Sequence, residues 1–196
     1  MNDNFLKNLK KENKINIENL KEISLKLGKN YDYFNLNKIK IDKAPSNFFW
    51  IGLIVVAMPE AKIIHVVRDA RATCWSIYKH LFQDNGSEFS YSFENIIRFY
   101  KLYIDLMEFW NEKFPNRIYD LNYDDLTINQ ENAARDLLTC VDLEFSPLCI
   151  DFYKTNRAIE TASAKQVRQK LYQGSSDSWK KYKSHLSKFV QDLKGY

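Results

Sequence analysis

The residues with the clearest chemical potential are two arginines and a serine that follow a run of β-branched side chains. Residues 62–67 read Lys-Ile-Ile-His-Val-Val and predict a buried strand of a parallel sheet. Arg-Asp-Ala-Arg follows at 68–71, and a helical pattern over 72–82 carries Ser76. Ligands of open α/β sheets bind beyond the strand ends, where the start of a helix offers N–H groups to an anion. We therefore expect Arg68 and Ser76 to bind a phosphate. A simple salt bridge between the arginine and its neighbouring aspartate is the alternative.

Other kinds of chemistry find less support. The sequence contains three histidines and three cysteines, which are His65, His80, His185, Cys74, Cys140 and Cys149. Their spacing matches no zinc site, and an odd number of cysteines without a CxxC pair favours a reducing compartment over a disulfide scaffold. His65 lies inside the predicted strand and is expected to be a core or strand-end residue, and His185 a solvated one. A P-loop kinase is a weaker alternative, because GxxxxGK[ST] does not occur.

Length and composition favour one folded domain. The 196 residues are 45% hydrophobic and 15% aromatic, which excludes disordered and low-complexity classes. The net charge of +4 arises before residue 44, where ten Lys face six acidic residues, so no nucleic-acid-binding stripe is expected. Residues 1–14 form a polar lead-in without a signal peptide, and 15–196 the domain. The apolar run 48–58 is too short to cross a membrane. We expect a cytoplasmic protein.

Helical and strand patterns alternate along the chain. The expected helices are 17–27 ending at Gly28, 48–58 capped by Ser46 or Asn47 and ended by Pro59, 72–82, 92–114, 131–141, and about 179–193 capped within 175–178. The expected strands are 62–67 and 117–123, with a short strand or edge segment within 34–41. Residues 146–152 are ambiguous and 154–170 read as an extended loop. This alternation predicts an α/β fold with a parallel sheet.

Four ordered motifs resemble bacterial sulfotransferases, of the type whose catalytic domain follows tetratricopeptide repeats, and tyrosylprotein sulfotransferases more remotely. The first two are Asp42–Phe48 with Ile51–Ile54, and Met58–Ile64 continuing into Val67–Tyr78. The others are Asn122–Leu126, and Thr161–Gln169 followed by Tyr172, Ser175, Ser176, Trp179 and Tyr182. The resemblance implies a three-layer, P-loop-like α/β fold.

The resemblance also implies a co-substrate, 3′-phosphoadenosine 5′-phosphosulfate, and no metal. Arg68 and Ser76 correspond to the residues that hold the 3′-phosphate in the family, and Tyr123 to a nucleotide contact. A loop that folds over the nucleotide matches at Ser163, Gln166, Val167, Arg168 and Tyr172. His80 lies near a basic nucleotide-contact position of the family.

One family element has no match. Family members begin with a strand and a Gly/Ser/Thr-rich loop whose N–H groups hold the 5′-phosphosulfate, a role that needs small residues. Before Asp42 the only glycine is Gly28, and neither Glu18 nor Glu22 matches the family's general base. We therefore expect an N-terminally truncated sulfotransferase domain, with catalytic residues unknown and an upstream polypeptide as a possible complement. It would transfer sulfonate to an unidentified hydroxyl or amine; the alternative is a nucleotide-binding or interaction module that has kept the fold without the reaction.

Overall fold

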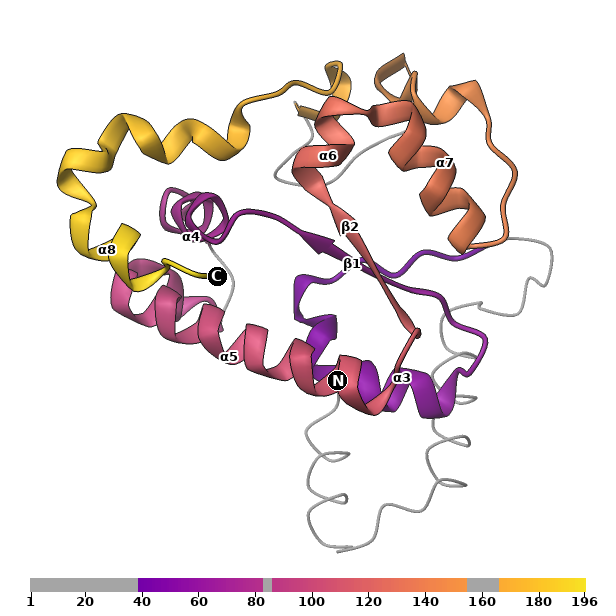
Figure 1. Ribbon diagram of the computed structural model, residues 1–196, viewed down its shortest axis with the longest axis horizontal. Helices are drawn as coiled ribbons and strands as arrows, with labels where there is room; N and C mark the ends of the chain where they lie inside the picture. The colour runs from indigo at the N-terminus through magenta and orange to yellow at the C-terminus, as the bar shows by residue number, and fades with distance from the viewer. Residues whose placement is uncertain (1–38, 83–85, 155–165) are drawn as a thin grey trace, which may run out of the picture. The chain divides into compact units, whose positions relative to one another are not determined.

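The computed structural model describes residues 39–82, 86–154 and 166–196 (Figure 1). The chain divides into two units, Met1–Ala61 and Lys62–Tyr196, which are treated separately. In the first unit a 3-10 helix, η1 (Pro45–Trp50), leads into α3 (Ile51–Ala57). A helix over this apolar run was predicted, but neither Ser46 nor Asn47 caps it, because Pro45 starts the 3-10 turn earlier. Residues 39–44 contain no strand, and the helix expected at 17–27 lies outside the described residues.

The second unit contains a parallel pair of strands. These are β1 (Ile63–Val67) and β2 (Ile118–Asn122), paired in register from Ile63 opposite Ile118 to Val67 opposite Asn122. Between them the chain forms α4 (Ala70–Tyr78), the 3-10 helix η2 (Glu88–Tyr91) and the long α5 (Phe93–Lys113). Parallel strands require such a crossover connection. The predicted α/β class with a parallel sheet is confirmed.

After β2 the described chain is helical. The elements are α6 (Tyr123–Ile128), α7 (Gln130–Cys140), α8 (Ser187–Asp192) and the 3-10 helices η3 (Pro147–Cys149), η4 (Phe152–Lys154), η5 (Gln166–Arg168) and η6 (Ser175–His185). The single helix predicted at 179–193 is wrong. After Gly174, which has a φ of 85°, η6 begins at Ser175, four residues before the predicted start at Trp179. The helix is interrupted again at Leu186, before α8 begins. The extended loop predicted at 154–170 contains η5.

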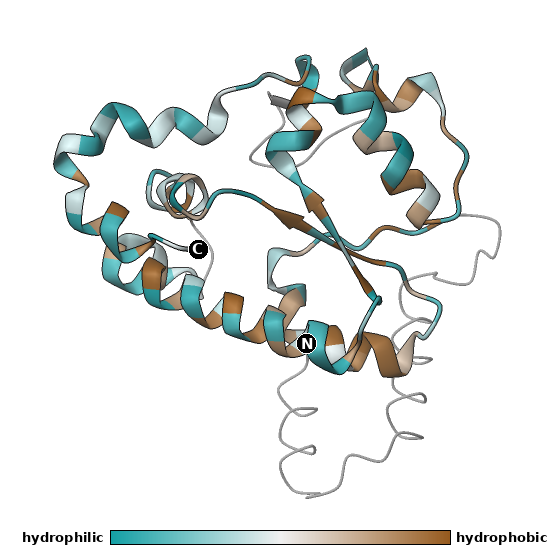
Figure 2. Ribbon diagram, viewed as in Figure 1, coloured by the Kyte–Doolittle hydropathy of each residue, from teal (hydrophilic) through white to brown (hydrophobic). Residues whose placement is uncertain are grey.

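A core of apolar side chains joins α4, α5, η6 and α8. Its buried members are Ala70, Ala72, Cys74, Trp75, Ile96, Ile97, Tyr100, Trp179, Leu186, Phe189 and Leu193. Figure 2 shows the hydrophobic positions recurring between hydrophilic ones along α5, as expected for a helix that is buried on one side. This packing fixes α4, whose first residues lie at the end of β1.

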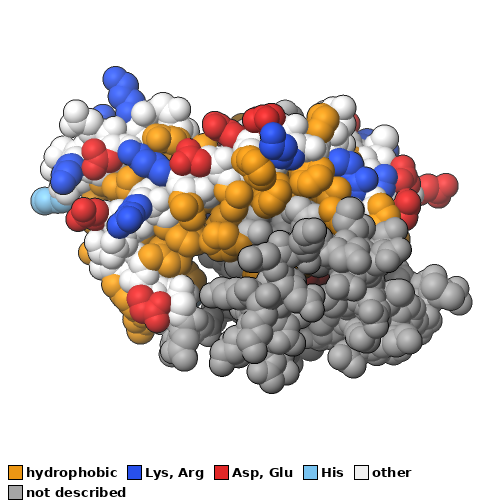
Figure 3. Space-filling model, turned by 90° about the horizontal axis from the view of Figure 1, so that it is seen from below, with side chains coloured by type: hydrophobic (Ala, Val, Ile, Leu, Met, Phe, Trp, Pro, Cys, Tyr) orange, Lys and Arg blue, Asp and Glu red, His pale blue; other side chains and the backbone are white. Residues whose placement is uncertain are grey.

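Charges of both signs occur on the described part of the surface. Lys/Arg and Asp/Glu side chains are interspersed over the face drawn in Figure 3. Within the described ranges, no helix has the length and apolar character needed to cross a bilayer.

Candidate functional site

Arg68 and Tyr123 lie together at the carboxyl ends of the two strands. Arg68 follows β1 directly, as predicted, and Tyr123 follows β2 as the first residue of α6. Because the strands are parallel, their carboxyl ends share one edge of the sheet. The Arg68 guanidinium carbon lies 5.0 Å from the centre of the Tyr123 ring, within the range of a cation–π contact.

Two serines from a distant part of the chain complete the contacts of Arg68. Its Nε donates to Ser176 Oγ at 2.9 Å, and its Nη2 donates to Ser175 Oγ at 3.1 Å. Ser175 Oγ in turn donates to Tyr123 Oη at 3.4 Å. Both serines are the first residues of η6, which follows the left-handed Gly174. A guanidinium beside two hydroxyls and an aromatic ring is a set of groups suited to a phosphorylated ligand.

A carboxylate belongs to the same network. Ser176 Oγ donates to Asp124 Oδ1 at 2.5 Å. Asp124 is held in place because the Asn122 side chain caps α6 and accepts from the backbone N–H groups of Asp124 and Asp125. We call Arg68, Tyr123, Asp124, Ser175 and Ser176 the Arg68 cluster.

The start of α4 is occupied by Asp69. Its carboxylate accepts from Ala72 N at 2.9 Å and from Arg71 Nη2 at 2.6 Å, and the Arg71 guanidinium lies 5.0 Å from the Trp179 ring centre. Burial alone would raise the pKa of the Asp69 carboxyl, but the hydrogen bonds from Arg71 and Ala72 and the charge of Arg71 outweigh it and lower that pKa. Asp69 therefore takes the Ala72 N–H, one of the groups that the start of α4 was expected to offer to an anion. The arginine paired with Asp69 is Arg71, whereas Arg68 turns to the serines.

A pocket of about 350 Å³ adjoins the Arg68 cluster. Asp124 and Ser176 line it, together with Asp69, Arg71, Thr127, Ile128, Gln173, Gly174, Asp177, Trp179 and Lys180. Acidic and basic side chains face this space together, and Lys180 pairs with Asp177 at 2.7 Å. The pocket thus offers polar contacts beside the cluster.

The other predicted site residues are placed differently. Ser76 lies exposed on α4, and the hydrogen bonds of Arg68 go to Ser175 and Ser176. Ser163 is outside the described residues, while Gln166, Val167 and Arg168 form η5 and Tyr172 is exposed on the segment that precedes Gly174. Ser175 and Ser176 were expected only as caps of the last helix, and η6 instead begins at Ser175 with Gly174 at its cap position. No ligand-binding role was predicted for these serines or for Asp124, although all three lie in the family motifs. Their relevant signal is the adjacent Ser-Ser pair directly after a glycine.

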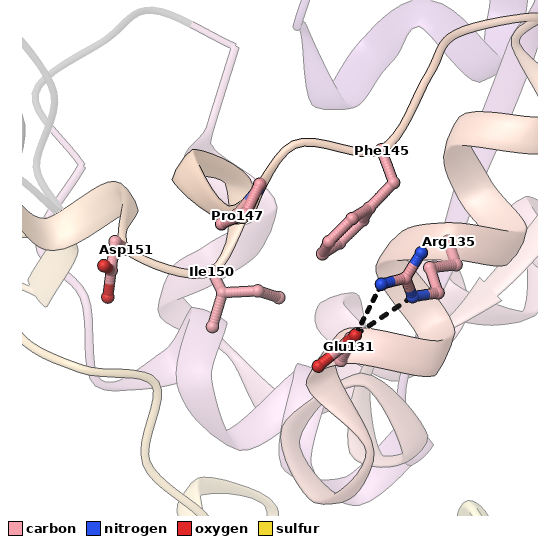
Figure 4. Close-up of a pocket in the computed structure, with 6 residues that line it drawn as sticks. All are labelled: Glu131, Arg135, Phe145, Pro147, Ile150 and Asp151. Carbon is pink, nitrogen blue, oxygen red and sulfur yellow. Dashed lines mark hydrogen bonds and ion pairs between the residues drawn. The ribbon is translucent and has the colours of Figure 1, made fainter.

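A second pocket, of about 300 Å³, lies between α7 and the segment around η3 (Figure 4). Arg135 donates to Glu131 Oε1 at 3.0 and 2.7 Å, and its guanidinium lies 3.8 Å from the centre of the Phe145 ring. Pro147, Ile150 and Asp151 complete the lining. No member of the Arg68 cluster lines this pocket, so the two are distinct.

The remaining titratable candidates do not gather into a metal site. Within the described ranges, no three His, Cys, Asp or Glu side chains are arranged to hold a metal ion. Cys74 is fully buried, and burial, with the nearby charge of Asp69, raises the pKa of its thiol to about 12. It is therefore a core residue and not a nucleophile at neutral pH. His65 lies in β1 against Asp120 and Tyr103, as expected for a strand residue.

Comparisons with known proteins agree with the sequence motifs. A sequence profile of the sulfotransferase family matches residues 4–147. The chain is 33% identical over 157 residues to an uncharacterized protein of Aquifex aeolicus, covering 78% of this chain and 20% of that protein. It is 32% identical over 112 residues to the omega-hydroxy-beta-dihydromenaquinone-9 sulfotransferase Stf3 of Mycobacterium bovis and of Mycobacterium tuberculosis, covering 54% of this chain and 29% of Stf3. The chain thus spans less than a third of the length of these curated relatives.

Proposed function

Because the chain belongs to the sulfotransferase family, we propose that it acts in the transfer of a sulfonate group from 3′-phosphoadenosine 5′-phosphosulfate to an acceptor hydroxyl or amine. The Arg68 cluster is the proposed binding site for the 3′-phosphate of this nucleotide. The observation that supports it is the position of Arg68 at the end of β1, hydrogen-bonded to two serine hydroxyls and lying over Tyr123.

The groups present suit a phosphate. A guanidinium carries five N–H donors in a fork that matches phosphate oxygens, and each serine hydroxyl can rotate to donate to an anion. The half-buried ring of Tyr123 offers a flat apolar surface beside them. The negative charge of Asp124 repels a phosphate. Because Ser176 donates its hydroxyl proton to this carboxylate, that hydroxyl must rotate toward the phosphate before it can donate to it.

The nucleotide supplies the sulfonate, whose bond to the 5′-phosphate oxygen breaks as a bond to the acceptor oxygen or nitrogen forms. Adenosine 3′,5′-bisphosphate leaves, and the acceptor loses the proton of its hydroxyl or amine. In this proposal Arg68 and the serines bind and orient the nucleotide, and Tyr123 packs against it. The contributions of Ser76 and of the loop that contains Ser163 and Arg168 remain predictions. A hydroxyl acceptor is supported by the name of Stf3, which describes a sulfotransferase of an omega-hydroxy compound.

Calorimetric titration with adenosine 3′,5′-bisphosphate tests the site. We expect wild-type protein to bind near micromolar, Arg68→Ala to bind at least about 100-fold more weakly because a charged bidentate contact is lost, and Arg68→Lys to bind about tenfold more weakly. Arg98→Ala, which removes an exposed arginine from α5, is the control and should bind like wild type. Equal binding by Arg68→Ala, or no binding by folded wild-type protein, refutes the site.

The reaction needs a separate assay. The wild-type chain is incubated with 3′-phosphoadenosine 5′-phosphosulfate and a panel of alcohols and amines, and release of adenosine 3′,5′-bisphosphate is measured. Acceptor-dependent release that Arg68→Ala abolishes supports sulfonate transfer. Binding without any release would instead favour the nucleotide-binding module.

A further inference from the structure

A second polar cluster lies on the same two strands, shortly before the Arg68 cluster. His65 of β1 and Asp120 of β2 are partners in the strand register, and His65 Nδ1 lies 2.7 Å from Asp120 Oδ1. On its other side His65 Nε2 is hydrogen-bonded to the hydroxyl of Tyr103 from α5. The His65 side chain is 16% exposed and that of Asp120 is 55% exposed. One imidazole therefore links both strands to the long helix.

The partners of His65 determine where its proton lies. Burial and the charge of Asp120 raise the pKa of the Tyr103 hydroxyl to about 12, so it is protonated at neutral pH. We therefore assign Tyr103 as the donor to the Nε2 lone pair of a neutral His65, and the Nδ1–H of His65 as the donor to the Asp120 carboxylate. The two hydrogen bonds of His65 then run in one direction, from Tyr103 through His65 to Asp120.

Protonation of the imidazole disturbs this order. It would place an N–H at Nε2, facing the Tyr103 oxygen, so the phenolic proton would have to turn elsewhere. The titratable groups hydrogen-bonded to His65 are Asp120 from β2 and Tyr103 from α5, and the Tyr100 ring centre lies 5.4 Å from that of Tyr103.

The spacing along the strands connects the two clusters. Arg68 follows His65 by three residues, and Tyr123 follows Asp120 by the same three residues. Because His65 and Asp120 are register partners, their hydrogen bond resists sliding of one strand along the other. That register is also what brings Arg68 over the ring of Tyr123.

We propose that Tyr103, His65 and Asp120 are positioning residues, a chain of ordered hydrogen bonds that holds Arg68 over Tyr123 and is loosened when His65 is protonated. Its effect on a ligand rests on the proposed nucleotide site. Its effect on the placement of Arg68 and Tyr123 does not depend on any ligand.

The ligand-independent test is NMR of the full chain between pH 5 and 8, following the imidazole nitrogens of His65 and the backbone amides of Arg68 and Tyr123. When His65 is uncharged in the wild-type protein, we expect its ring proton on Nδ1. Both amides should shift with the same midpoint as His65. Tyr103→Phe should uncouple the amides from His65, and Tyr91→Phe, which removes an exposed tyrosine hydrogen bond of η2, should not.

Variants of Asp120 test whether this residue acts as the hydrogen-bond acceptor for His65 or only packs against it. Asp120→Asn keeps an oxygen that can accept from Nδ1–H and should retain the Nδ1–H form, whereas Asp120→Ala should lose it. Asp105→Asn, at an exposed position of α5, is the control for charge. A proton on Nε2 in neutral wild-type protein, or amides of Arg68 and Tyr123 that ignore His65, would overturn the proposal.

A ligand arm distinguishes the two proposals. Tyr103→Phe should bind adenosine 3′,5′-bisphosphate about tenfold more weakly than wild type at pH 8, within the usual range of coupling between linked sites. Because phosphate itself titrates near pH 6, the comparison is between the two proteins at each pH. Absence of binding by wild type would refute the nucleotide site and leave the NMR result standing. Equal binding by both proteins would refute the positioning role.

Discussion

Replacement of Asp69 tests how the start of α4 is stabilised. Asp69→Ala removes the cap on Ala72 N, which costs about 1 kcal/mol in comparable helices. It also releases Arg71 from a hydrogen-bonded pair that is about one-third exposed, worth about 0.5 kcal/mol after allowance for solvent screening. Arg71 then lies less firmly over Trp179, a contact worth about 0.5 kcal/mol. We expect a loss of about 2 kcal/mol in the free energy of unfolding.

Asp69→Asn is the matched variant. Asparagine caps helices as well as aspartate, so this variant should lose only the charge-dependent part, about 1 kcal/mol. The assay is urea unfolding followed by circular dichroism, with an unchanged m value as the condition for comparing midpoints. Equal losses for the alanine and asparagine variants would refute the cap, and a loss below about 0.5 kcal/mol for Asp69→Ala would refute the whole account.

The pH dependence of this difference has a definite sign. The pKa of Asp69 is lower in the folded protein than its ordinary value of 3.8. Its charge therefore stabilises the fold fully above that ordinary value, and the contribution is lost as the pH falls through the folded pKa. The stability difference between wild type and Asp69→Asn should be constant near neutral pH and shrink below about pH 4. A difference that grows on acidification would contradict the pairing with Arg71.

Three further outcomes follow from burial and charge. Leu193→Ala opens the core beneath α8, where Leu193 is 1% exposed, and should cost about 3 kcal/mol in urea unfolding; a loss below about 1 kcal/mol would show that α8 does not anchor the core. Cys74 should resist a thiol reagent at pH 8 until the protein unfolds, whereas exposed Cys149 reacts at once, and equal rates would contradict the burial of Cys74. Asp124→Asn removes a negative charge beside the proposed phosphate and weakens the competing hold on Ser176, so calorimetry should show about fivefold tighter binding of adenosine 3′,5′-bisphosphate, and weaker binding would contradict the opposition of Asp124.

The strands and the long helix were predictable because their signal is local. A run of β-branched residues marks β1, and apolar positions repeating with helical spacing mark α5, so that no predicted end differs from the observed one by more than one residue. The prediction of a single last helix was wrong, and the reason is also local. Between Ser175 and His185 the chain is mostly polar, so burial of Trp179 alone does not sustain one regular α-helix.

The partners of Arg68 could not be predicted in the same way, because they depend on the tertiary packing that places the start of η6 beside the end of β1. Spacing suggested Ser76, but the buried positions of α4 include Cys74 and Trp75, and the next residue, Ser76, is exposed.

Trp179 explains why the two serines take this place. Trp179 is buried, and the Arg71 guanidinium lies over its ring. Arg71 in turn donates a hydrogen bond to Asp69 at the start of α4. This contact fixes η6 beside α4, and Ser176 precedes Trp179 by three residues, close to one turn of a 3-10 helix, in which positions three apart lie on the same side. Ser176 is thereby directed toward the same helix terminus and reaches Arg68. The two arginines of the Arg-Asp-Ala-Arg sequence thus have different structural roles. Arg71 positions η6 through Trp179, and Arg68 donates hydrogen bonds to the serine hydroxyls at the start of η6.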